Sequence, residues 1–350
     1  MNQVLYGERS RNPLSRTVEL TGDRLRVGSR TTPLYELNLG AMAEAYQRGR
    51  WLGGGGTERP PHTLADGAGI VPVTRVTGSC TPVRARHAAR FAHQLGNLAV
   101  LRCGGPGQVA ALSARGRAEG VPLWIARRFA PGPAGQIAVA VERRLVRVDV
   151  WGPHAPVLRL RAPYGFRPDA PEPSKGLRLT VADTAAGLGL EKNWRKSRSL
   201  VEVRIPGRHW VLRRENATSS RLLCNDRPVA LLTRLPSRLA REPGMVLLPL
   251  APVHYASGDP LDAVMAQLFA AAFGLGDTTG SARFRAERGR PVYRGEPAAA
   301  DDDAWGRPWY SNLGRGRPDN EPGGGDGWGA DGGDGGGGDG GGGDGGGGGE

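Results

Sequence analysis

Short runs of apolar residues, many alternating with polar ones and bounded by turn residues, recur along most of the chain. Such runs are typical of β-strands, because successive side chains of a strand point to opposite faces. Glycine, asparagine and aspartate between two runs favour hairpins, because these residues tolerate the positive φ of tight turns. The clearest hairpins are 17–20 with 24–27, turning at Gly22, and 221–224 with 229–233, turning at Asn225 and Asp226. Further strands are predicted at 34–39, 70–76, 98–102, 123–127, 137–150, 157–160, 177–181, 200–205, 210–213 and 246–250.

One strong helix is predicted near the end of these strands, in Asp259–Gly276 (DPLDAVMAQLFAAAFGLG). Asp259 is placed to cap it, Pro260 suits the first helical position, and Gly274 or Gly276 can take the left-handed conformation that stops a helix. A helix that is apolar on all sides must be buried. The 14 residues before Gly274 are fewer than the roughly 20 that span a bilayer, so we expect a core helix enclosed by strands.

Two weaker helices are predicted at 41–50 and 87–95. About a dozen strands followed by one strong helix favour a mainly β fold, since alternating βαβ units would need a helix after each strand. The expected architecture is an antiparallel sheet system, or a closed barrel, enclosing one hydrophobic C-terminal helix.

Three regions are expected along the chain. Residues 1–280 form a β-rich globular body with a sub-boundary near 130–136, and residues 281–322 form an irregular polar linker. Residues 323–350 form a Gly/Asp-rich tail that cannot bury enough apolar surface to fold, so we expect it to be a disordered, anionic tether. Its acids, with no basic residue among them, are Asp326, Asp331, Asp334, Asp339, Asp344 and Glu350.

The rest of the chain is strongly basic. The formal charge of +13 rises to +19 when the six tail acids are left out, which suggests an anionic membrane surface, nucleic acid or another polyanion as partner. GC-rich coding is an alternative cause, because 44 of the 47 basic residues are arginine. Arginines at alternating strand positions, such as Arg147, Arg159 and Arg161, also have the pattern of a solvated sheet face. Both readings stay open.

No export signal, membrane span or metal-binding spacing is visible. The first residues lack an apolar segment of signal-peptide length, so we expect a cytoplasmic protein. Cys80, Cys103 and Cys224 are far apart and odd in number, which predicts reduced thiols rather than a disulfide framework or a zinc site.

Motifs of catalysis are also missing from the sequence. It contains no phosphate-binding P-loop, no GxSxG nucleophile elbow and no HExxH zinc motif, and Gly187 and Gly189 lack the third glycine of a dinucleotide loop. The six histidines are scattered. We therefore expect a protein that is not an enzyme and needs neither cofactor nor metal, and an enzyme of unrecognised class is the second alternative.

One cluster of cations surrounds a tryptophan, and it is the candidate anion-binding site. Cations bind phosphates through charge and hydrogen bonds, while a tryptophan can stack on a base or lie at a lipid interface. A solvated hairpin tip, with the tryptophan folded back on the sheet, is the alternative. The candidate residues are Lys192, Trp194, Arg195, Lys196, Arg198, Arg208, Arg213 and Arg214.

The order of elements resembles the tubby-like superfamily, which includes the phospholipid scramblases and the LURP-one-related proteins. The likeness covers residues 137–276 and is carried by WVLRR from Trp210, LLCNDRPVALL from Leu222 and DPL from Asp259. It implies a closed antiparallel barrel around a hydrophobic C-terminal helix, and binding of phosphoinositides or other anionic lipids or a scaffold role. The calcium-binding and palmitoylated-cysteine features of the scramblases have no counterpart here, so lipid scrambling is not implied.

These observations favour a non-enzymatic binding or scaffold protein whose basic face meets anionic lipid headgroups. The first alternative is a nucleic-acid-associated protein that uses the same arginines.

Overall fold

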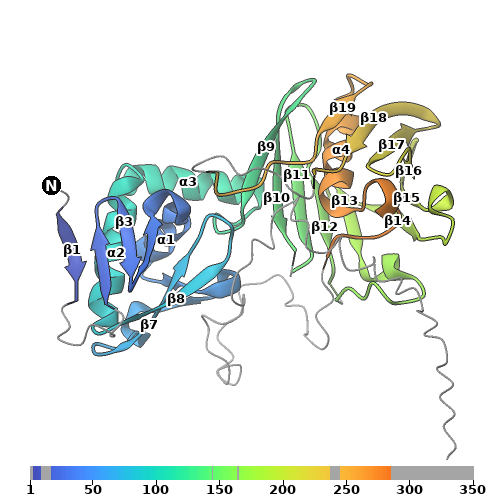
Figure 1. The fold of residues 1–350 in the computed structure, drawn as a ribbon. Coiled ribbons are helices and arrows are strands. Elements are labelled where there is room, and N and C mark those ends of the chain that lie inside the picture. Colours follow the sequence, from blue (N-terminus) through green and yellow to red (C-terminus); the bar gives the residue numbers. More distant parts are fainter. Residues whose placement is uncertain (1–2, 9–16, 144, 164, 237–244, 285–350) are drawn as a thin grey trace, which may run out of the picture.

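The computed structural model describes residues 3–8, 17–143, 145–163, 165–236 and 245–284. The tail 323–350 and most of the expected linker 281–322 lie outside these residues. Two parts lie side by side: a smaller N-terminal part that contains three helices, and a large antiparallel barrel (Figure 1).

The N-terminal part begins with a four-stranded antiparallel sheet in the order β1-β2-β3-β4. The predicted hairpin 17–20/24–27 is formed by β2 and β3. The helix α2 packs its apolar stripe, with Phe91 and Leu95 fully buried, against β1, β7 and β8. The elements are β1 (Val4–Gly7), β2 (Val18–Thr21), β3 (Arg24–Val27), β4 (Arg30–Pro33), α1 (Leu39–Gln47), β5 (Trp51–Leu52), β6 (Glu58–Arg59), β7 (Gly69–Thr74), β8 (Cys80–Ala85), α2 (Ala88–Arg102) and α3 (Pro106–Glu119).

Helices in this part differ from the prediction in three places. The run 98–102, predicted as a strand, is the end of α2, because the apolar stripe of the predicted helix 87–95 continues through Leu98 and Ala99. The run 34–39 forms a 3₁₀ turn, η1 (Leu34–Glu36), and then enters α1. The helix α3 was not predicted, since its buried face consists only of Val109, Ser113 and Gly116 and gives no apolar stripe.

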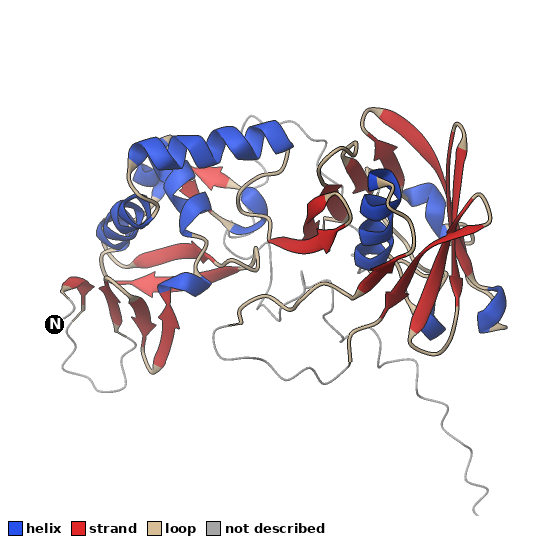
Figure 2. Cartoon of the chain, turned by 90° about the horizontal axis from the view of Figure 1, so that it is seen from above, coloured by secondary structure: helices blue, strands red, loops and turns tan. Residues whose placement is uncertain are grey.

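The barrel is a single 11-stranded antiparallel sheet in the described part of the chain, and each strand pairs with the next one in sequence from β9 to β19. It is nearly closed, and it encloses the last helix, as Figure 2 shows from above. The predicted fold class is therefore confirmed. Its strands are β9 (Arg127–Gly132), β10 (Gly135–Glu142), β11 (Arg147–Trp151), β12 (Leu158–Arg161), β13 (Arg178–Val181), β14 (Thr184–Glu191), β15 (Leu200–Ile205), β16 (Arg208–Arg214), β17 (Ser219–Cys224), β18 (Arg227–Thr233) and β19 (Val253–Tyr255).

Local turn chemistry accounts for the hairpins that were predicted well. Asn225 and Asp226 both have positive φ, 47° and 65°, and join β17 to β18. The run 137–150 is divided into β10 and β11, and residues 130–136, where a sub-boundary is expected, contain the turn between β9 and β10.

Two strand predictions in the barrel were wrong, and the strand β14 (Thr184–Glu191) was not predicted. Residues 123–127 lead into β9 through a turn, and the last strand is β19 rather than 246–250. The strand β14 was missed, because its sequence TAAGLGLE contains two glycines and little β-branched character. Its pairing with β13 and β15 stabilises it as a strand, although its own residues favour a strand only weakly.

The helix α4 (Pro260–Ala272) is buried along almost its whole length, from Asp262 to Ala272. It begins as predicted, because the side chain of Asp259 accepts hydrogen bonds from the amides of Leu261 and Asp262. Its end differs from the prediction: Phe273 leaves the helix in an extended conformation, and the first positive φ, 63°, comes later at Gly276.

Ion pairs and hydrogen bonds hold the N-terminus of α4 to the strand β16. The guanidinium of Arg208 donates to both carboxylate oxygens of Asp259, at 3.0 and 2.8 Å. Asp262 is buried and accepts from Trp210 Nε1 at 2.9 Å and from the Ser257 hydroxyl at 2.9 Å. Carboxylates at this end of a helix are further favoured by the helix dipole.

A buried carboxylate links the barrel to the N-terminal part. Asp149 is fully buried and accepts hydrogen bonds from Arg147 at 2.8 Å, Arg159 at 2.9 Å and Arg161 at 2.5 Å. Arg147 and Arg159 also donate to the backbone carbonyls of Glu119 and Gly120, where α3 ends. Arg147 and Arg159 thus tie α3 to the outer face of the barrel, and the three arginines are not simply the solvated face that their spacing suggests.

The chain after α4 remains part of the core up to the last described residue. The amide of Gly274 donates to the carbonyl of Ser281, and the Arg283 amide donates to the carbonyl of Ala272. Phe284 is buried against Phe166, with ring centroids 6.0 Å apart. The polar linker expected from residue 281 therefore starts inside the body.

Phe269→Asp is expected to unfold the barrel. Phe269 is fully buried in α4, and an unpaired carboxylate there costs several kcal/mol, against a total stability of roughly 5–15 kcal/mol for a typical domain. Thermal melting followed by circular dichroism measures this, with Phe269→Leu as the control that keeps a cooperative transition. A Phe269→Asp protein that melts like the wild type would contradict the enclosed position of α4.

Asp149→Asn is expected to lower the free energy of unfolding by about 3 kcal/mol, because it leaves three arginines facing one another without their shared anion. Urea denaturation measures the loss. The matched control is Asp226→Asn, which makes the same chemical change at an exposed turn that favours asparagine. Equal midpoints for the two variants would show that Asp149 does not stabilise the fold.

Candidate functional site

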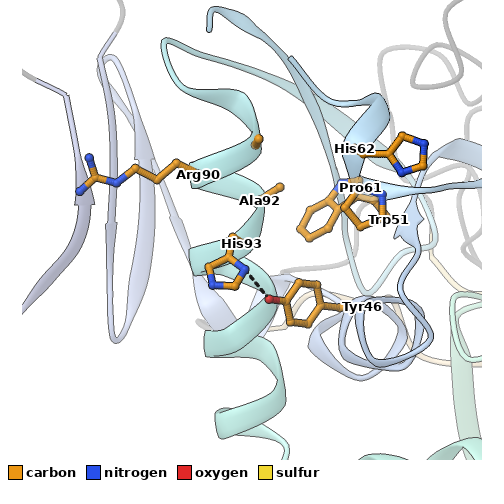
Figure 3. Close-up of a pocket in the computed structure, with 8 residues that line it drawn as sticks. Tyr46, Trp51, Pro61, His62, Arg90, Ala92 and His93 are labelled. Carbon is orange, nitrogen blue, oxygen red and sulfur yellow. Dashed lines mark hydrogen bonds between the residues drawn. The ribbon is translucent and has the colours of Figure 1, made fainter. Parts of the chain in front are cut away.

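Two surface features carry groups capable of binding a ligand: a pocket in the N-terminal part and the cluster of cations around Trp194 on the barrel. The pocket has a volume of about 400 Å³ and lies between α1, α2 and the 3₁₀ turn η3 (Pro61–Thr63) (Figure 3). Its lining is mostly apolar. The lining residues are Tyr46, Trp51, Pro61, His62, Ala89, Arg90, Ala92 and His93.

Three polar side chains of the pocket, those of Tyr46, Trp51 and His93, already have hydrogen-bond partners. The hydroxyl of Tyr46 lies 2.6 Å from His93 Nδ1, and the other ring nitrogen of His93 lies 3.0 Å from the side-chain amide of Asn97. Trp51 is buried and donates its Nε1–H to the carbonyl of Pro72. In Figure 3 the guanidinium of Arg90 points away from His62 and Trp51. The pocket thus presents an apolar wall and few groups that converge on a ligand.

A glycine in the middle of α2 shapes this pocket. A Cβ at Gly96 would lie 2.5 Å from the ring of Tyr46, so only glycine lets that ring lie on the helix and reach His93. Burial raises the pKa of Tyr46 above its ordinary value. No sequence signal indicated this pocket, because its residues come from four separate segments.

The predicted cation cluster forms the connection from β14 to β15, which includes the 3₁₀ turn η5 (Lys196–Arg198). Trp194 does not fold back on the sheet, since 82% of its surface is exposed. The guanidinium of Arg195 lies over its ring, 4.6 Å from the centroid. Lys192, Arg195 and Arg198 are exposed beside it.

Two residues of β16 join this cluster at one end of the barrel. Arg213 is exposed and pairs across the sheet with Leu200, two residues after Arg198. Arg214 and Lys196 donate to the same carboxylate, that of Asp277. We call this surface the Trp194 patch, and its members are Lys192, Trp194, Arg195, Lys196, Arg198, Arg213 and Arg214.

Arg208, the remaining candidate, lies at the opposite end of β16 and is paired with Asp259 at the start of α4. The structure therefore brings seven of the eight predicted residues together and places the eighth in a structural ion pair. Asp277 is the charged neighbour that sequence reasoning missed, because it is 81 residues from Lys196 and isolated in its own segment.

The described residues contain no group of three or more His, Cys, Asp and Glu side chains that could hold a metal ion. Burial raises the pKa of Cys80 to about 12, and burial together with the charge of Asp262 raises that of Cys224 to about 11. Both thiols therefore stay protonated near neutral pH and are poor nucleophiles. In the described ranges, no helix is both long and apolar enough to cross a membrane.

Comparison of the chain with protein-family models, curated proteins and solved structures gives no significant match. The tubby-like resemblance therefore stays a hypothesis.

Gly96→Ala is expected to displace Tyr46 and break its hydrogen bond with His93, at a cost of about 1–3 kcal/mol for the overpacked contact. The matched control is Gly107→Ala in α3, where a Cβ would meet no atom within 4 Å and should leave stability unchanged or slightly raised. Urea denaturation of both variants decides the matter: equal stability would mean that the Tyr46 ring moves without cost.

Proposed function

We propose that this protein is a non-enzymatic binding or scaffold protein that docks on anionic membrane surfaces through the Trp194 patch. The observation that carries the proposal is the 82% exposure of Trp194 at the tip of a connection rich in cations. A large aromatic side chain in water loses the free energy that its burial would provide, so its exposure favours a surface that accepts it.

The residue types of the patch suit the boundary between lipid headgroups and acyl chains. Tryptophan is favoured at this depth, because its ring is apolar and its indole N–H can still reach water or a headgroup. Each Lys or Arg close to an anionic membrane contributes about 1 kcal/mol to binding. The patch combines both contributions on one connection.

A membrane accounts for this geometry better than a single-stranded nucleic acid does. Proteins that bind single strands without sequence preference use several aromatic side chains along a groove, so that successive bases can stack. Trp194 is the exposed aromatic of the patch. The other exposed large hydrophobic side chains of the described chain lie on different elements: Val4, Tyr35, Leu101, Phe129 and Leu145. The anionic-lipid binding implied by the tubby-like resemblance supports the same choice.

Trp194→Ala is expected to weaken binding to phosphatidylcholine vesicles that contain phosphatidylserine by roughly tenfold, or about 1.4 kcal/mol. Because this contribution is apolar, the loss should be similar at low and at physiological salt. The double variant Arg195→Gln/Arg198→Gln should also weaken binding, but its effect should shrink as salt rises. Vesicle co-sedimentation measures both.

The controls make the same changes elsewhere on the surface. Tyr35→Ala removes an exposed aromatic in the N-terminal part, and Arg227→Gln removes an exposed cation at the other end of the barrel; both should bind like the wild type at physiological salt. Equal losses for Trp194→Ala and Tyr35→Ala would overturn the proposal. Tighter binding to single-stranded DNA or RNA than to vesicles would favour the nucleic-acid alternative.

A further inference from the structure

The carboxylate of Asp277 lies between two cations of the patch. It accepts from Arg214 Nε at 2.7 Å and from Lys196 Nζ at 3.2 Å. Arg214 belongs to β16 and Lys196 to the connection that carries Trp194, so this acid ties the connection to the barrel.

The position of Asp277 is set by its backbone and not only by the ion pairs. It lies in the 3₁₀ turn η6 (Gly276–Thr278), and its amide donates to the carbonyl of Ala217 at 3.1 Å. The amide of the preceding Gly276 donates to the buried hydroxyl of Ser220 at 2.8 Å. A Cβ at Gly276 would lie 2.2 Å from the carbonyl oxygen of Ala217, so glycine is needed for this close approach.

The carboxylate of Asp277 is ionised at neutral pH, but its ion pairs are weak. The hydrogen bond from Arg214 lowers the pKa of Asp277 below its ordinary value, so the carboxylate stays ionised in the neutral range. The side chains of Lys196, Asp277 and Arg214 remain 61%, 33% and 27% exposed. Ion pairs that are partly open to water are screened and contribute little, so another anion can compete for their cations.

We propose that Asp277 is a built-in competitor that holds Lys196 and Arg214 in the place of the ligand's anionic group. Binding of a lipid headgroup exchanges this carboxylate for a headgroup oxygen and frees the connection that carries Trp194. The inference rests on the proposed function, since it names the residues of that patch that meet the headgroup and the residue that restrains them.

The test is Asp277→Asn, which keeps the shape of the side chain and the backbone hydrogen bond to Ala217 while removing the charge. It is expected to bind phosphatidylserine-containing vesicles about fivefold more tightly than the wild type, which corresponds to the release of about one cation to the surface. Asp226→Asn is the matched control, because it makes the same charge change at the β17–β18 turn, and this turn joins the ends of those strands remote from Asp277. At physiological salt, where charges are screened beyond about 8 Å, only Asp277→Asn should keep its gain.

A combined variant shows whether the gain acts through the proposed contacts. Asp277→Asn added to Lys196→Gln/Arg214→Gln should bind no more tightly than Lys196→Gln/Arg214→Gln alone, because both cations that Asp277 holds are gone. A gain that persists undiminished in the Lys196→Gln/Arg214→Gln background would overturn the inference. Hydrogen exchange in the free protein gives a second readout: residues 192–199 should exchange faster in Asp277→Asn than in Asp226→Asn, and equal rates would also overturn it.

The outcomes separate this inference from the proposed function. If the wild type binds vesicles and the two asparagine variants bind equally, Asp277 is not a competitor and the proposed function stands. If only Asp277→Asn binds, the competitor is confirmed and the unmodified protein is not a membrane binder. If neither the wild type nor Asp277→Asn binds, both proposals fail.

Discussion

Enclosure of α4 is the constraint on which the rest of the structure depends. A helix with apolar residues on all sides is stable only when every face is covered, and the meander from β9 to β19 supplies that cover. The alanines of α4 let the strands approach closely, while Phe269 and Phe273 fill the remaining space with rings 5.4 Å apart. The polar N-terminus of α4 is held against β16 by Asp259 and Asp262, which bond to Arg208 and Trp210 of that strand.

The large positive charge divides into structural and exposed arginines. Arg147, Arg159 and Arg161 surround the buried Asp149, and Arg147 and Arg159 also reach the carbonyls at the end of α3, so this cluster joins two parts of the molecule. Arg208 likewise forms an ion pair with Asp259 at the N-terminus of α4. Net charge alone therefore overstates the surface offered to a polyanion.

The Trp194 patch and the barrel core are connected through the chain that leaves α4. Gly274 to Gly280 run from the buried end of the helix to the base of the patch, where the backbone at Gly280 packs against Glu191 and Ser199. Asp277 lies within this short segment. The segment from Gly274 to Gly280 thus completes the core and also places Asp277 among the cations. The charge of the patch therefore depends on the correct folding of this segment.

Local signals in the sequence were enough to predict the hairpin turn at Asn225 and Asp226, the Asp259–Pro260 start of α4 and the burial of that helix. Backbone preference, capping and a continuous apolar run all act over a few residues. Local signals also located the cluster around Trp194. Only the tertiary structure decided that β14 is a strand, that Arg208 is separated from the patch, that Trp194 faces solvent and that Asp277 lies against Lys196. Each of these depends on which segments, tens of residues apart, pack together, and no short stretch of sequence carries that information.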